Sequence, residues 1–172
     1  LPQNSEDLKA RRQTIYQASR YAGGYIPFGS TKEIGTDAIF ALRIITADVD
    51  KKYGTNYSER IKNYHHYCQK NDLSLAGAVT DPKGDRSLRP FEQPSEYTYL
   101  KIVERRADGI VVRGAKCHIT SAPTVNELLV LPTRNMGKGD EDYAVAFAIP
   151  ADAPGIKMIA NPDYTPHDEM EF

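Results

Sequence analysis

The apolar residues of this 172-residue chain change their spacing near residue 72, and this change limits the possible fold more than any other feature. Before it, apolar side chains recur every three or four residues, the period of an amphipathic α-helix. From Leu73 onward they alternate with polar ones, as in a β-strand. The pattern therefore predicts an α+β chain with helices first and an antiparallel sheet after them.

Three helices are expected before the change, at Ser5 to Tyr21, about Thr36 to Tyr53 and about Tyr57 to Lys70. Ser5 is a candidate cap for the first. One apolar stripe is predicted for the second, made of Ala38, Leu42, Ile45 and Val49. The third is predicted to present one face made of Ile61, Tyr64, His65 and Cys68.

Short strands are expected after the change, with a hairpin at Asp108-Gly109 because this pair lies between two alternating runs. The predicted strands are Leu73 to Val79, Tyr97 to Arg106, Ile110 to Ile119, Leu128 to Leu131, Tyr143 to Ile149 and Ile156 to Ile159. So few strands, without a closing partner, predict an incomplete barrel or sandwich.

The composition excludes several classes of function. Lys plus Arg numbers 22 and Asp plus Glu numbers 23, so the chain has no electrostatic footprint for nucleic acid or an anionic membrane. Its apolar stretches are too short for a transmembrane helix. The two cysteines, Cys68 and Cys117, are too few for a disulfide scaffold and favour reduced thiols in a cytoplasmic protein.

The most distinctive segment is the turn from Thr80 to Arg86, with the sequence Thr-Asp-Pro-Lys-Gly-Asp-Arg. Gly84 permits a positive φ, Lys83 and Arg86 can hold a pyrophosphate, and exposed backbone N–H groups can bond a heterocycle. A solvated surface turn has the same composition, and spacing alone favours that simpler interpretation.

The histidines and cysteines do not form a metal-binding pattern. His65 and His66 are neighbours on a helix and point about 100° apart, so we interpret His65 as a packing residue. Cys117 and His118 fall on opposite faces of the strand expected there, so no zinc site is predicted.

Several motifs in order resemble the 4-hydroxyphenylacetate 3-hydroxylase family of flavoproteins, and the dehydratase branch above all, whose type member is 4-hydroxybutyryl-CoA dehydratase (vinylacetyl-CoA isomerase). They are Tyr53-Gly-Thr-Asn-Tyr57, Asn71-Asp-Leu73, Gly77 to Arg86, Val103 to Lys116, His118-Ile-Thr120, Leu131-Pro-Thr133 and Asp142-Tyr-Ala-Val145. The resemblance covers nearly the whole chain.

The resemblance implies an acyl-CoA dehydrogenase-like fold in a homotetramer, with residues 1–72 ending an N-terminal helical domain and residues 73–172 forming most of a middle β domain. It implies FAD and reverses the preference for a plain surface turn. The implied FAD-binding residues are Val79, Thr80, Asp81, Pro82, Lys83, Gly84, Asp85, Arg86 and Thr120. Since the chain begins at Leu1 and ends at Phe172, we expect a fragment without the C-terminal helical domain, and catalytic residues lie outside it.

One departure from the dehydratase pattern bears on the chemistry. That branch binds a [4Fe–4S] cluster partly through a C-x-x-x-C pair, but here Phe28 to Ile34 contains no cysteine, and Gly29 and Glu33 occupy the matching positions. No iron–sulfur cluster is therefore expected. The Arg and Tyr that the hydroxylase branch has in this neighbourhood are absent as well.

Three functions remain open from the sequence. The first is an FAD-dependent enzyme that acts on an acyl-CoA or a related small substrate. The second is an aromatic monooxygenase that takes a phenolic substrate and receives reduced flavin from a separate reductase. The third is a non-catalytic, truncated subunit. No membrane or nucleic-acid partner is expected for any of them.

Overall fold

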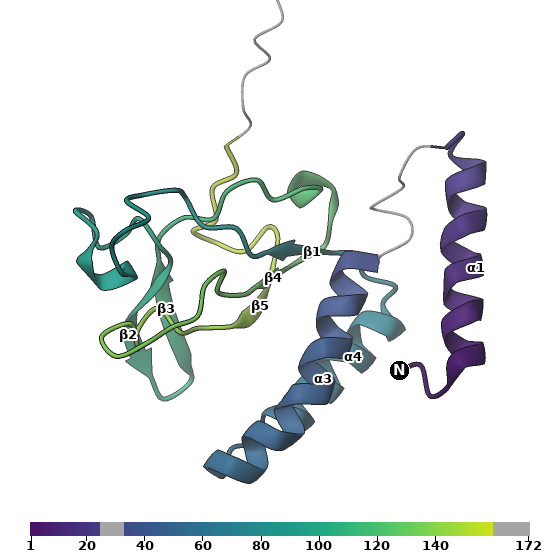
Figure 1. Cartoon of the computed structure of the whole chain (residues 1–172), viewed down its shortest axis with the longest axis horizontal. Coiled ribbons are helices and arrows are strands. Elements are labelled where there is room, and N and C mark those ends of the chain that lie inside the picture. The colour runs from purple at the N-terminus through teal and green to yellow at the C-terminus, as the bar shows by residue number, and fades with distance from the viewer. Residues whose placement is uncertain (25–32, 160–172) are drawn as a thin grey trace, which may run out of the picture.

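The computed structural model describes residues 1–24 and 33–159, and in them helices precede strands as predicted (Figure 1). The α+β class is confirmed. The helices are α1 Ser5–Tyr21, α3 Glu33–Tyr53 and α4 Tyr57–Lys70. The strands are β1 Leu75–Ala78, β2 Lys101–Arg106, β3 Gly109–Arg113, β4 Glu127–Val130 and β5 Phe147–Pro150, with short 3-10 turns at η1 Pro90–Glu92 and η2 Ala122–Thr124.

Helix α1 has the predicted extent, but its cap is the residue before the expected one. The side chain of Asn4 accepts hydrogen bonds from the backbone N–H groups of Glu6 and Asp7, at 2.8 and 3.1 Å. These bonds satisfy two donors that the first turn leaves unpaired. The helix has no buried residue and is tied to α3 by an ion pair of 2.6 Å between Arg11 and Asp37.

The buried face of α3 differs from the predicted apolar stripe. Ile39 is 2% exposed and Thr46 is 9% exposed, whereas Ile45 of the predicted stripe is 58% exposed. Thr46 tolerates burial because its hydroxyl donates to the backbone oxygen of Leu42 at 2.7 Å. The predicted stripe is confirmed for Ala38 and Leu42, which pack on the core, and fails at Ile45, where the neighbouring Thr46 is buried instead.

Helix α4 packs on α3 with the predicted face inward, since His65 and Cys68 are both buried. Its first turn is fixed from α3: the carboxylate of Asp50 accepts from the backbone N–H groups of Tyr57 and Ser58, each at 2.7 Å. An anionic acceptor at this position also stabilises the positive end of the helix dipole.

The strands form a mixed sheet and a separate hairpin, so the expectation of a wholly antiparallel sheet is wrong. The sheet order is β1-β4-β5, with β1 parallel to β4 and β4 antiparallel to β5. A period of two does not reveal strand direction, and residues 79–126 form a connection long enough to return β4 parallel to β1. Among the described residues the sheets do not close into a barrel.

The β2–β3 hairpin is confirmed, with Arg106 paired to Gly109 across the Ala107-Asp108 turn. Its strands are shorter than predicted because Gly114, with φ of +140°, turns β3 away. The backbone of Gly114 passes so close to Leu100 that a Cβ there would lie 2.4 Å from the Leu100 Cα. The strand predicted at residues 156–159 is absent, because this segment is coil after a turn.

The core contains one cluster on each face of the sheet. On the helical side, Ile39, Cys68, Leu75 and Leu129 join α3 and α4 to β1 and β4. On the other side, Ala76, Ala78, Leu128 and Val130 are covered by later segments of the chain. Helices give way to strands between residues 70 and 75, close to the predicted boundary at 72, but the first cluster spans this boundary. The division into two domains stays a prediction.

Helix α3 passes close to β1 at Gly35, where a Cβ would lie 2.3 Å from the Leu75 Cβ. We therefore predict that Gly35→Ala lowers the free energy of unfolding by about 1–3 kcal/mol, because the helix must move off the strand. Urea unfolding measures this change. Gly109→Ala is the matched control, since a Cβ there meets nothing within 4 Å. Equal midpoints for the two variants would contradict the close packing.

Burial of Glu127 on β4 predicts a pH dependence. The side chain is 5% exposed, and its burial raises the pKa of the carboxyl although the Tyr64 hydroxyl donates to it at 3.2 Å. The folded state thus holds this proton more tightly than the unfolded chain does. Stability should fall as pH rises from the ordinary pKa of 4.5 through the raised one.

Glu127→Gln should remove the loss of folding stability that ionisation of Glu127 causes. The variant should therefore gain stability relative to the parent as pH rises from about 4 to 7. Urea midpoints measured across that range test the prediction, with the exposed Glu59→Gln as control. Parallel curves for the parent and Glu127→Gln would show that Glu127 does not titrate in this way.

Candidate functional site

The candidate site lies where the parallel strands β1 and β4 end side by side (Figure 1). The segment Val79 to Arg86 leaves β1 at its carboxyl end as irregular backbone. In sheets with parallel strands, the carboxyl ends of neighbouring strands form the usual place for a ligand. The parallel pairing, which the sequence did not predict, therefore gives the segment a position typical of binding sites.

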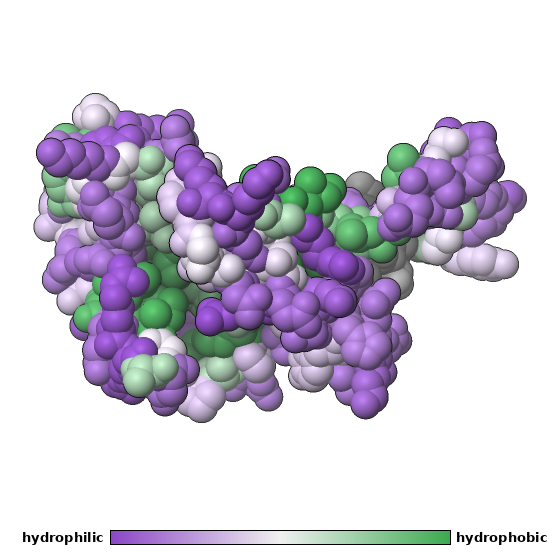
Figure 2. All heavy atoms as spheres, turned by 90° about the horizontal axis from the view of Figure 1, so that it is seen from below, coloured by the Kyte–Doolittle hydropathy of each residue, from purple (hydrophilic) through white to green (hydrophobic). Residues whose placement is uncertain are grey.

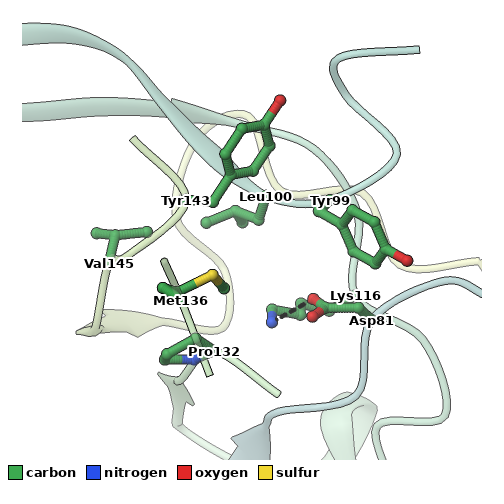
Figure 3. A pocket seen from close by; sticks show the side chains of 8 residues that line it. All are labelled: Asp81, Tyr99, Leu100, Lys116, Pro132, Met136, Tyr143 and Val145. Atoms are coloured by element: carbon green, nitrogen blue, oxygen red, sulfur yellow. Dashed lines mark hydrogen bonds and ion pairs between the residues drawn. The ribbon is translucent and has the colours of Figure 1, made fainter. Parts of the chain in front are cut away.

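The first half of this segment is fixed by Lys116, which the sequence analysis did not single out. Its ammonium donates to the backbone oxygens of Val79 and Leu131 at 2.9 and 2.8 Å, and to the carboxylate of Asp81 at 2.5 Å. The two charged side chains are only 10% and 7% exposed. Figure 3 shows them pointing toward each other below Tyr99.

Two neighbouring residues add to this anchoring. The Cys117 backbone N–H donates to the Thr80 oxygen at 2.9 Å, and its thiol contacts the Asp81 oxygen at 3.2 Å. On the other side, the Thr133 hydroxyl accepts from the Asp81 N–H at 3.1 Å and donates to the Val79 oxygen. The backbone oxygens of Val79, Thr80 and Asp81 are thus all turned toward the protein.

The second half of the segment is held by Gln93 and Tyr99, both buried. The Gln93 amide accepts from the Asp85 N–H at 3.0 Å and donates to the Asp85 oxygen at 2.7 Å, while the Tyr99 hydroxyl donates to the Lys83 oxygen at 3.2 Å. Gly84 has the predicted positive φ, +48°, and a Cβ there would lie 2.5 Å from the Gln93 oxygen. Glycine is required here by both conformation and space.

Within the segment, the two carboxylates are bonded to other protein groups and the two cations face solvent. Asp81 is paired with Lys116. The Asp85 carboxylate accepts hydrogen bonds from the hydroxyl and the backbone N–H of Ser87, and these bonds hold the pKa of Asp85 below its usual value. Lys83 and Arg86 are exposed, and neither has an ion pair within residues 1–24 and 33–159.

Backbone donors are available beside these cations. The N–H groups of five residues find no acceptor in the described part of the chain, namely those of Val79, Thr80, Lys83, Gly84 and Arg86. Pro82 has no N–H, and those of Asp81 and Asp85 are used internally. The outer surface therefore offers two cations and several N–H donors, a combination suited to an anionic or acceptor-rich ligand.

Thr120 lies on a turn that packs over the same sheet. Its neighbours Ile119 and Ala122 contact the cluster that contains Ala78, and Ser121 has a φ of +67°. The Thr120 side chain is exposed. The structure thus brings the turn of Thr120 against β1, while its hydroxyl makes no hydrogen bond to any described residue.

The pocket beside Lys116 is too small for a substrate (Figure 3). Its volume is about 10 Å³, the space of a single water molecule. It is lined by Asp81, Tyr99, Leu100, Lys116, Pro132, Met136, Tyr143 and Val145. This mainly apolar lining surrounds the Lys116–Asp81 pair and separates it from water.

Other candidates from the sequence lie elsewhere. His65 is 5% exposed between α3 and α4, where the Arg43 guanidinium lies 3.2 Å from its ring, as expected for a packing residue. Residues 28–32 of the cysteine-free segment lie outside the described residues, and Glu33 begins α3. Across residues 1–24 and 33–159, no group of three possible ligands could hold a metal ion, and none of the helices is long and apolar enough to cross a bilayer.

Comparison with known proteins decides the family. A family model described as the N-terminal part of 4-hydroxyphenylacetate 3-hydroxylase matches residues 1–172. The chain belongs to the 4-hydroxyphenylacetate 3-hydroxylase family. The resemblance seen in the sequence is therefore confirmed.

Curated members of this family include both expected branches. The chain is 43% identical over 159 residues to 4-hydroxybutyryl-CoA dehydratase/vinylacetyl-CoA-Δ-isomerase of Clostridium aminobutyricum, covering 92% of the chain and 32% of the relative. It is 31% identical to a 4-hydroxyphenylacetate 3-monooxygenase oxygenase component of Geobacillus sp. strain PA-9, again covering 92% and 32%. The chain thus spans about a third of the length of these relatives.

Solved structures of the family share this fold. A 4-hydroxybutyryl-CoA dehydratase from N. maritimus aligns with a TM-score of 0.82 and 33% identity, and the match covers 90% of this chain and 30% of the dehydratase chain. The oxygenase component of a 4-hydroxyphenylacetate 3-monooxygenase complexed with FAD matches the same shares with a TM-score of 0.73 and 30% identity.

Proposed function

We propose that this chain forms the FAD-binding part of a flavin-dependent enzyme, with Val79 to Arg86 and Thr120 contacting the cofactor. The observation that carries the proposal is the division of charge in the segment after β1. Both carboxylates are bonded within the protein, whereas Lys83, Arg86 and several N–H groups are left for a ligand. A relative of this fold is complexed with FAD.

The residues present fit this cofactor. Lys83 and Arg86 match a pyrophosphate, which is anionic and rich in acceptors. The free N–H groups and the Thr120 hydroxyl match the polar edge of a flavin ring. When bound, FAD would supply the redox chemistry, and these residues would bind and orient it. Asp81 would take part through its backbone, because its carboxylate is held by Lys116.

For the reaction, we favour isomerase-type or related flavin redox chemistry on an acyl-CoA or a related small substrate. The support is the 43% identity and the TM-score of 0.82 to proteins of the dehydratase branch. The second candidate is a reduced-flavin monooxygenase that acts on a phenol together with a reductase. The cysteine-free Phe28 to Ile34 segment favours this alternative, since it needs no cluster.

The remaining parts of the proposal concern the whole protein. Residues 1–72 would end a helical domain, and residues 73–172 would form most of a β barrel or sandwich domain that contains the mixed β1-β4-β5 sheet. The assembly would be a homo-oligomer of the acyl-CoA dehydrogenase type. The two free cysteines support a cytoplasmic location.

Removing the exposed cations should weaken FAD binding. We predict that Lys83→Ala and Arg86→Ala in the full-length protein each cost about 1.5–3 kcal/mol of binding free energy, because each removes a charged contact to the cofactor. Titration of the apoprotein with FAD measures this cost. Lys51→Ala, at the far end of α3, is the control. An unchanged affinity in both site variants would contradict the assignment of the segment.

The metal content of the full-length protein would distinguish it from cluster-containing dehydratases. We predict that the full-length protein, purified without oxygen, contains no [4Fe–4S] cluster, because both cysteines of the expected pair are replaced. Iron and sulfide analysis together with the visible spectrum checks this prediction. About four irons per subunit would refute it and would reopen cluster-assisted dehydration.

A further inference from the structure

We propose that Lys116 is a positioning residue for the FAD site: it fixes the segment after β1 in the conformation that presents its donors outward. This inference rests on the proposed FAD binding. Lys116 lies outside the set of residues proposed to contact the cofactor, and its ammonium is 2.5 to 2.9 Å from three acceptors on the inner side of the segment and of β4.

The bonding of Lys116 is complete. An ammonium has three donors, and here they are directed to Val79, Asp81 and Leu131. Two of these acceptors are backbone oxygens at the exits of β1 and β4, and the third is a carboxylate within the segment itself. A single side chain therefore connects two strand ends and the turn.

Lys116 holds β1 and β4 together beyond the last hydrogen bond of the sheet. The last ladder bond between the two strands is that from the Leu131 N–H to the Ala78 oxygen, at 3.2 Å. Beyond it, the chains are held by side chains, those of Lys116 and Thr133. Without Lys116 the oxygen of Val79 would lose a charged donor, and the segment could turn its oxygens outward.

The same residue links the two proposed groups of cofactor contacts. Lys116 and Cys117 are bonded to Val79, Thr80 and Asp81, and the chain reaches Thr120 three residues later. The position of Thr120 relative to the segment is therefore set in part by Lys116, together with the bonds of Cys117 and the packing of Ile119 and Ala122. Loss of this anchor would misplace both groups of donors together.

The surroundings make lysine hard to replace. The pair lies beside an apolar pocket wall that includes Leu100, Met136 and Val145 (Figure 3). Methionine there would leave the Asp81 carboxylate buried without a partner, which is costly. Arginine would keep the charge, but its planar, forked donors cannot reach three acceptors that converge on one point.

The test compares Lys116→Met, Lys116→Arg and the exposed control Lys51→Met in the full-length protein. FAD is titrated into each apoprotein after far-UV circular dichroism has shown that it is folded, and the visible circular dichroism of the bound flavin is recorded at saturation. The visible signal reports the surroundings of the ring, which overall destabilisation of the folded protein would not change.

We expect Lys116→Met to raise the dissociation constant for FAD roughly tenfold or more. Lys116→Arg should not recover the full FAD affinity of the parent. The visible circular dichroism of the bound flavin should change in both Lys116 variants, and Lys51→Met should match the parent in affinity and signal. A folded Lys116→Met with parental affinity and spectrum would overturn the proposal. If Lys116→Met does not fold, Lys116→Arg decides, and full parental behaviour there would refute it. A parent protein that binds no FAD would instead refute the proposed function.

Discussion

A buried ammonium holds the candidate site together. Lys116 bonds the exits of β1 and β4 and the carboxylate of Asp81, in surroundings where both charges are nearly inaccessible to water. Removing one partner of such a pair leaves an uncompensated charge, so the pair must form whenever the segment is in place. The conformation of the whole segment depends on this contact and on the Thr133 and Gln93 contacts around it.

This internal bonding explains how an electrically balanced turn can attract an anion. The segment contains Asp81, Lys83, Asp85 and Arg86, so its formal charge is zero. Because one carboxylate is buried against Lys116 and the other accepts from Ser87, the cations dominate the exposed surface together with free N–H donors. Specific binding of an anionic ligand would depend on this local arrangement, because the net charge of the chain is only -1.

The sequence predicts what depends on neighbouring residues and misses what depends on distant ones. Helix α4 and the positive φ of Gly84 follow from local patterns, and both are confirmed. The burial of Thr46 in place of Ile45 depends on the tertiary packing of α3, whose partner along much of its length is α4. The parallel pairing of β1 with β4 and the Lys116–Asp81 pair join residues far apart in the chain, and no spacing reveals them. Only the family resemblance favoured FAD contact for the Val79 to Arg86 segment, and that assignment stays a prediction.

Hydrogen–deuterium exchange of the full-length protein, with and without saturating FAD, tests the central claim most directly. The account predicts slower exchange on FAD binding at the free amides of Thr80, Lys83, Gly84 and Arg86, and around Thr120. The amides of Asp81 and Asp85, already bonded within the protein, should change much less. Bound FAD together with unchanged exchange across residues 79–86 would contradict the account.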